Sequence, residues 1–171
     1  MLSFKHILVP IDFSGPSKRA LKLAAELAIK FGSSLTLVHV CEIPTYAGMA
    51  ASLPDLISSL EQSAARALEQ IVEPVRRKLP STTSVIRTGV AWEEILEVSR
   101  EAKSDLIIVG THGRTGFARA WLGSVAEKLV RLAAVPVLTI REGEQASEPE
   151  HVDRHRTLEK AHTVPIPAPH R

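Results

Sequence analysis

The sequence predicts an α/β domain built on a parallel sheet of five strands. Short, continuous apolar runs typical of buried strands alternate with longer segments whose apolar residues recur at helical spacing. Strands separated in this way by helices lie parallel in one sheet, and right-handed crossovers place the helices on both of its faces. The 171 residues suit one domain with some additional length, since a domain usually takes about 100–200 residues.

Residues 7–11 are expected to form the first strand, because this branched apolar run is continuous and stops at a cluster of turn-forming residues. A helix is expected over residues 17–31, where alanine and leucine recur at helical spacing. Ser14 or Ser17 can supply its N-cap, and Gly32 can terminate it.

The middle of the chain continues the alternation. Residues 34–41 are a second apolar strand, and a long helical segment follows from about residue 56 to residue 78. Pro74 is expected to bend or divide that helix, because proline lacks the N–H of a helical hydrogen bond. Residues 83–88 form a third strand, whose less apolar composition places it nearer an edge of the sheet, and residues 92–102 return to helical spacing.

The last part of the pattern begins with residues 106–109, the clearest buried strand, which lead into a glycine-rich loop. A helix over residues 124–132 and a strand over residues 135–140 complete the fold. Beyond them apolar periodicity stops, and 4 of the 11 prolines and 4 of the 7 histidines gather. We therefore expect one domain over residues 1–141 and a disordered C-terminal tail over residues 142–171.

Composition excludes several classes of function. Lysine and arginine number 21 against 19 acidic residues, and a net charge of +2 is too small to indicate a nucleic-acid or membrane-surface protein. The single cysteine, Cys41, excludes an intramolecular disulfide and a cysteine-based zinc site. The chain also lacks an apolar export signal and any run of 18 apolar residues. We expect a cytoplasmic protein with no nucleic-acid or membrane partner.

A candidate ligand site follows from the topology, because parallel sheets bind ligands beyond the carboxyl ends of their strands, where the strand order reverses. Pro10-Ile11-Asp12, Val40-Cys41 and the glycine loop after the fourth strand should meet at that edge. The loop has the spacing Gly110-x2-Gly113-x9-Gly123-Ser124 and runs into a helix. The free amides at the start of that helix suit an anion.

Together with Leu37-Val38-His39-Val40 and Val135-Pro136-Val137-Leu138, these motifs resemble the universal stress protein family from about residue 4 to residue 141. The resemblance implies a Rossmann-like open sheet of strand order 3-2-1-4-5. Because every position of the glycine motif is kept, it also implies the ATP-binding branch of the family. A homodimer that pairs its fifth strands, Val137–Ile140, is implied as well and would cover an aggregation-prone edge.

The resemblance further implies which residues hold ATP. Asp12 is expected near the ribose or adenine, Val40 to contact adenine through its main chain, and Gly110 and Gly113 to contact ribose and phosphate through theirs. A Mg or Mn ion would be bound through the phosphates. The complete predicted site is Pro10, Ile11, Asp12, Val40, Gly110, His112, Gly113, Arg114, Gly123, Ser124 and Val125, with the last three at the phosphates.

Each of these residues also has a structural alternative. Asp12 can cap the helix that follows it, and Ser124 with Glu127 forms a Ser-x-x-Glu capping box. The glycines can serve as turn formers alone. Arg114 is either a neighbour of the phosphates or a solvated loop charge. His112 has no identifiable carboxylate or nucleophile partner, so we predict no catalytic residue.

The function we expect is that of an ATP-binding protein with a regulatory or stress-response role, and not that of an enzyme. Ser-Gly-Gly-x-Asp-Ser, His-x-Gly-His and Gly-x4-Gly-Lys-Ser/Thr motifs are absent from the sequence, so any ATP hydrolysis should be slow. His39, within the second strand, is expected to pack or hydrogen-bond there. The alternative is a stress protein that binds no nucleotide and acts as a protein-interaction module. The sequence does not identify its signalling partner.

Overall fold

The structure, a computed structural model, describes residues 4–42, 53–111 and 122–141. Strands and helices alternate through these residues, as the apolar pattern predicts. The elements are β1 (His6–Pro10), α1 (Gly15–Phe31), β2 (Ser34–Cys41), α2 (Leu53–Arg76), β3 (Thr82–Thr88), α3 (Ala91–Glu101), β4 (Leu106–Gly110), α4 (Ser124–Leu132) and β5 (Val137–Ile140).

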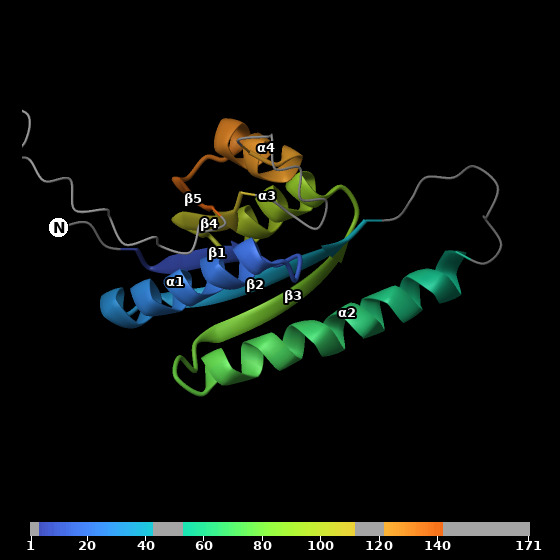
Figure 1. The fold of residues 1–171 in the computed structure, drawn as a ribbon, viewed down its shortest axis with the longest axis horizontal. Helices are drawn as coiled ribbons and strands as arrows, with labels where there is room; N and C mark the ends of the chain where they lie inside the picture. The colour runs from blue at the N-terminus through green and yellow to red at the C-terminus, as the bar shows by residue number, and fades with distance from the viewer. Residues whose placement is uncertain (1–3, 43–52, 112–121, 142–171) are drawn as a thin grey trace, which may run out of the picture.

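The five strands form one parallel sheet in the order β3-β2-β1-β4-β5. Helices α1 and α2 cover one face of the sheet, and α3 and α4 cover the other (Figure 1). This arrangement confirms the predicted Rossmann-like fold and its strand order. Strand β3 lies at an edge, as its polar composition predicts. Within the described part of the chain, no helix combines the length and apolar character that crossing a membrane requires.

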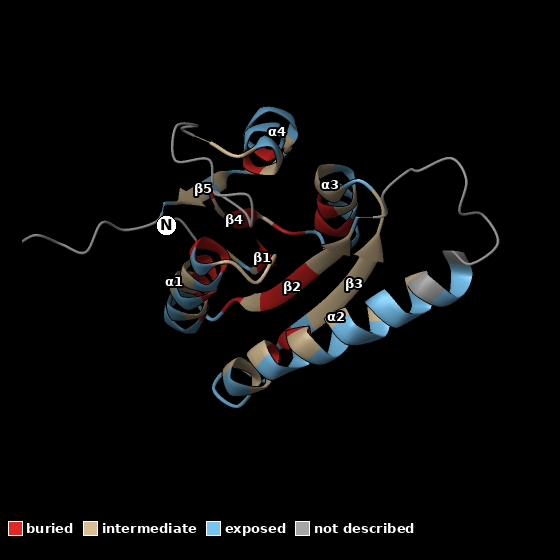
Figure 2. Ribbon diagram, turned by 45° about the vertical axis from the view of Figure 1, so that its right-hand side comes forward, coloured by how far each residue is buried: buried red, intermediate tan, exposed pale blue. Residues whose placement is uncertain are grey.

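The sheet separates two apolar layers, because successive side chains of a strand point to opposite faces. Ile7 of β1 packs in the layer under α1 and α2, whereas Leu8 packs in the layer under α3 and α4. Figure 2 shows the buried residues gathered in the central strands and on the inner sides of the helices. Both layers consist mainly of aliphatic side chains, so the central strands have no solvent-facing side.

Several element boundaries differ from the prediction. Strand β1 ends at Pro10, yet Ile11 stays buried because its amide donates to the carbonyl of Val38 at 2.8 Å. Strand β5 begins at Val137, two residues later than expected. Pro74 lies inside α2 without dividing it, since the helix ends at Arg76, within one turn of the proline.

The ends of α1 match their predicted signals. Ser14 is the N-cap, and its hydroxyl accepts a hydrogen bond from the amide of Ser17 at 3.3 Å. Gly32 ends the helix with a φ of 68°, a left-handed conformation that costs glycine little. These two caps fix the length of the helix that connects β1 to β2.

A polar network joins β1, β2 and the turn before β4 at the amino end of the sheet. The ring of His6 hydrogen-bonds through Nε2 to the hydroxyl of Thr36 and through Nδ1 to that of Ser34, both at 2.8 Å. The carboxylate of Asp105 accepts hydrogen bonds from the amides of Lys5, at 2.6 Å, and His6, at 3.1 Å. Burial lowers the pKa of His6, and the nearby carboxylate of Asp105 opposes this effect only in part.

The lowered pKa of His6 predicts a loss of stability in mild acid. The unfolded chain binds the proton more readily than the folded one, so the free energy of unfolding should fall as the pH drops below the ordinary value of 6.5. Replacing His6→Gln removes this contribution. Urea unfolding between pH 7.5 and 5.5 should therefore show a weaker pH dependence for the variant. Equal pH dependence in the two proteins would refute the assignment.

Candidate functional site

The site arises where β1 and β4 separate. The two strands are paired at Ile7 with Leu106 and at Leu8 with Ile107. After these two pairs, the chain that follows β1 stays bonded to β2, because the amide of Ile11 donates to the carbonyl of Val38. The chain after β4 bonds instead to β5, since the amide of Thr111 donates to the carbonyl of Ile140 at 2.8 Å. The carboxyl ends therefore diverge and leave a crevice between them.

A cavity of about 430 Å³ occupies this crevice, a volume in the range of small-molecule sites, which is about 300–1,000 Å³. The structure brings together eight of the eleven residues of the predicted nucleotide site along its walls. They are Pro10, Ile11, Asp12, Val40, Gly110, Gly123, Ser124 and Val125. The other three, His112, Gly113 and Arg114, lie outside the described residues.

Asp12 has a different local role from the one its position suggests. It is not the N-cap of α1, because Ser14 occupies that position. Its Oδ1 instead accepts hydrogen bonds from the amide of Ser14 at 3.0 Å and from the hydroxyl of Ser14 at 2.6 Å. Asp12 therefore orients the capping serine and also presents its carboxylate at the cavity wall.

Gly110, the last residue of β4, lies against the first turn of α1. A Cβ built at this position would stand 2.8 Å from the Cβ of Pro16 and 2.9 Å from the amide nitrogen of Ser17. No L side chain fits without a shift of the α1 backbone. Glycine at this position therefore permits the close packing of α1 on β4, and it also lines the cavity.

The start of α4 leaves amide groups available at the cavity. Gly123 is the N-cap, no side chain among the described residues caps the helix, and the first helical hydrogen bond runs from the amide of Glu127 to the carbonyl of Gly123 at 2.9 Å. The structural alternative, a Ser124–Glu127 capping box, is therefore wrong, since Ser124 already has a helical conformation and sits one position too late. The amides of Ser124, Val125 and Ala126 precede that first bond.

Helices α1 and α3 also begin at this cavity. Ser17 from the first turn of α1 and Ala91 from the start of α3 lie on its wall together with the first turn of α4. Each helix contributes the positive end of its dipole, which favours an anionic ligand. Asp12 and Glu42 add carboxylates, which accept hydrogen bonds from hydroxyl groups. The wall thus suits a ligand that carries both hydroxyl and anionic groups.

His39 makes the strand contacts that the sequence predicts and is also part of the cavity wall, which the sequence analysis missed. Its Nδ1 lies 2.6 Å from the carbonyl of Ile11, and its ring centroid lies 4.6 Å from that of Phe13. Because a carbonyl only accepts, Nδ1 carries the hydrogen and Nε2 of the neutral ring is an acceptor. Glu42 was also missed, although its place directly after the second strand could have indicated it.

Cys41 is half-buried and is not part of the cavity wall. Burial raises the pKa of its thiol, and the carboxylate of Glu61 raises it further. The thiol is therefore held protonated and is a poor nucleophile. Within the described residues, no cluster of three histidine, cysteine or acidic side chains is arranged to hold a metal ion.

Comparison with known proteins finds one family along nearly the whole described chain. The model of the universal stress protein family matches residues 3–141. Universal stress protein A homolog 1 of Coxiella burnetii is 34% identical over 143 residues, which cover 81% of this chain and 97% of that protein.

Solved structures agree with the family match. The universal stress protein UspA of Lactobacillus plantarum superposes with a TM-score of 0.75 at 26% identity, covering 82% of this chain and all of that one. A universal stress protein family member of Arabidopsis thaliana, solved with AMP bound, has a TM-score of 0.57 at 21% identity, covering 85% of this chain and 97% of that one.

The packing at Gly110 predicts a specific cost for adding one methyl group. Gly110→Ala should lower the free energy of unfolding by about 1–3 kcal/mol, because the new Cβ meets backbone atoms of α1 that cannot rotate away. Gly32→Asn is the matched control. Gly32 has open space around it, and asparagine tolerates left-handed backbone. Urea unfolding should show the larger loss for Gly110→Ala, and the reverse order would contradict the packing argument.

Proposed function

This chain belongs to the universal stress protein family, and we propose that it binds ATP in the cavity between β1 and β4 and acts in the stress response through that occupancy. The observation that carries the proposal is the start of α4, which no side chain of the described residues caps and which shares one wall with the carboxyl ends of β1 and β2. Phosphates would bind at the helix, and the nucleoside along the strand ends. The positive end of the α4 dipole favours the phosphates, whereas the carboxylates of Asp12 and Glu42 accept hydrogen bonds from the hydroxyl groups of the nucleoside.

The phosphate end of the proposed site consists mainly of main-chain groups. The amides of Ser124 and Val125 are free of helical acceptors and lie at the positive end of the α4 dipole. The amide of Gly123 is already used, because it donates to the carbonyl of Thr111 at 2.6 Å. That bond ties the start of α4 to the end of β4 and holds the two free amides in place.

The nucleoside end offers polar groups above an apolar wall. Val40 would contact adenine through its main chain, and the carboxylate of Asp12 would accept a hydrogen bond from a ribose hydroxyl. Val38, Ile95 and Val109 supply apolar surface for the base. The AMP complex of the Arabidopsis relative supports the choice of a nucleotide as ligand. It does not distinguish ATP from AMP, which the titration below does.

We expect a divalent ion, Mg or Mn, to be bound mainly through phosphate oxygens. The carboxylates that line the described cavity wall, Asp12 and Glu42, do not belong to a three-ligand cluster. The same wall includes no lysine or arginine among the described residues. Because the sequence has no Gly-x4-Gly-Lys-Ser/Thr motif to supply a lysine at the phosphates, we expect hydrolysis to be slow.

The decisive experiment is to purify the full chain without a tag, unfold it, and identify any released nucleotide by chromatography. The stripped and refolded protein is then titrated with ATP, ADP, AMP and cyclic AMP by calorimetry. ATP near one per chain, or tighter binding of ATP than of the others, supports the proposal. Absence of both release and rebinding would leave the alternative, a family member that acts by protein contact alone.

Ser124→Pro tests the phosphate end, because proline at the first helical position removes one free amide without breaking a helical hydrogen bond. Gly123 precedes it with a ψ of 157°, which suits a residue before proline. ATP affinity should fall by about 10-fold or more, the value of a lost hydrogen bond to a charged group. Ser124→Ala removes only the hydroxyl and separates its contribution. Unchanged affinity in Ser124→Pro would place the phosphates elsewhere.

We also propose that two chains pair along β5, the sheet edge next to β4. The carbonyls of Pro136 and Ile140 bond to β4 and its following residue, so by alternation the amide of Thr139 points outward. Thr139→Pro removes that outward amide and should yield a monomer in sedimentation velocity, whereas Thr139→Ala keeps it and should remain a dimer. A dimeric Thr139→Pro protein would exclude pairing through this edge.

A further inference from the structure

A second groove, of about 360 Å³, lies between α1 and the last turns of α2, away from the nucleotide cavity. Leu21, Ala25 and Ile29 of α1 face Val75 and Leu79 across it. Ile29 is 55% exposed, which is high for a large aliphatic side chain beside a packed core. The groove therefore presents an apolar floor that the described residues leave uncovered.

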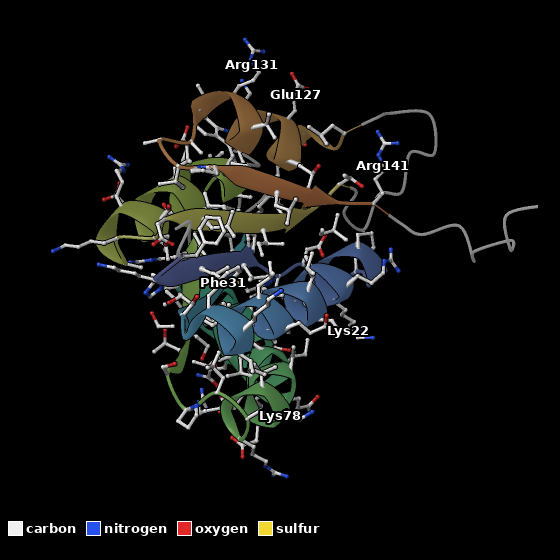
Figure 3. The ribbon with its side chains drawn as sticks, turned by 90° about the vertical axis from the view of Figure 1, so that its left-hand side faces the viewer. Lys22, Phe31, Lys78, Glu127, Arg131 and Arg141 are labelled. Atoms are coloured by element: carbon white, nitrogen blue, oxygen red, sulfur yellow. The ribbon has the colours of Figure 1, made fainter. Side chains whose placement is uncertain are left out.

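The rim of this α1–α2 groove is positively charged. Lys18 and Lys22 of α1 and Lys78 after α2 lie along it, with Glu26 as the one acidic residue of the groove. Figure 3 shows Lys22 and Lys78 extending from the two sides. Within the part of the chain that the structure describes, none of the three ammonium groups forms an ion pair, so they are available to an acidic segment.

The described chain ends beside α1, on the flank of this helix that faces β5. The carbonyl of Arg141 accepts a hydrogen bond at 3.3 Å from Nε of Arg19, the neighbour of Lys18 on α1. Figure 3 shows Arg141 on the side of α1 away from Lys78 and toward the end of the helix opposite Phe31. Arg141, the last described residue, therefore lies beside the first half of the helix that forms one wall of the groove.

The sequence that follows has the complementary charge. Residues 142–153 contain five acidic residues and no lysine or arginine. Twelve extended residues span at most about 40 Å, whereas α1 is about 10–12 Å wide and its 17 residues rise about 25 Å, so the segment is long enough to cross α1 and enter the groove. Ala146 and Val152 supply apolar side chains for its floor.

We propose that residues 142–153 of the same chain bind in the α1–α2 groove, with their carboxylates against Lys18, Lys22 and Lys78. Each exposed ion pair contributes little on its own, so the contact depends on several pairs together with the apolar floor. Such a contact is weak and weakens further at high salt. The segment then covers the groove from within the molecule, and another acidic partner must displace it to bind there.

The test uses the full chain with Cys41→Ser and Ser147→Cys, so that a nitroxide label can be attached at residue 147 only. Amide signals of the isotope-labelled protein report distance from the label, because the unpaired electron broadens nearby resonances. The amide signals of Ala25 and Leu79 should broaden, whereas that of Val130 on α4 should not.

The double variant Lys22→Glu with Lys78→Glu should abolish the broadening. The matched pair Lys103→Glu with Lys128→Glu, which makes the same charge change away from the groove, should preserve it.

Three results would overturn the proposal. The first is the absence of selective broadening at the groove, and the second is broadening that survives reversal of both groove lysines. The third comes from a mixture of spin-labelled protein without isotope and isotope-labelled protein without spin label. Broadening of Ala25 in that mixture would assign the groove to the segment of a second copy. Restoration of the signals in 1 M salt would support the ion pairs between the segment and the groove lysines, and these results do not depend on whether ATP binds.

Discussion

The pairing of β1 with β4 determines where the rest of the molecule can act. The two strands are hydrogen-bonded over a short register near their starts, and then each follows a different neighbour. Their separation opens the crevice, and it does so at the edge where α1, α3 and α4 all begin. A longer β1–β4 ladder would close the cavity with main chain. The ligand site is thus a consequence of strand pairing. The backbone creates the crevice, and the side chains on its wall determine its shape and polarity.

Main-chain contacts connect the parts of this edge. Thr111, 1% exposed, donates its amide to the carbonyl of Ile140 and accepts at its carbonyl the amide of Gly123. The start of α4 is therefore joined through one buried residue to the end of β5. Gly110, one residue earlier, allows α1 to pack directly on β4. Both contacts depend on the backbone, so the geometry of the site tolerates many side chains but few shifts in chain position.

Much of this could be predicted from the sequence, because strand and helix periodicity are local properties and the strand ends of a parallel sheet meet at a known edge. The errors concern single positions. Ser124 looks like a cap, but Gly123 takes that place because its extended backbone already precedes the helix. Asp12 looks like a cap as well, but it holds the capping Ser14. The α1–α2 groove left no sequence signal, since it depends on how far apart two helices pack on the sheet.

The network around His6 and the cavity lie at opposite ends of the same strands. One polar network that stabilises the fold thus lies at the amino edge, while the groups that can meet a ligand stand at the carboxyl edge. Natural selection can change the residues of one edge with little effect on the other, which lets a single scaffold acquire new ligands over evolutionary time. Gly110 is an exception, because it serves both packing and the cavity wall, so its replacement would affect both.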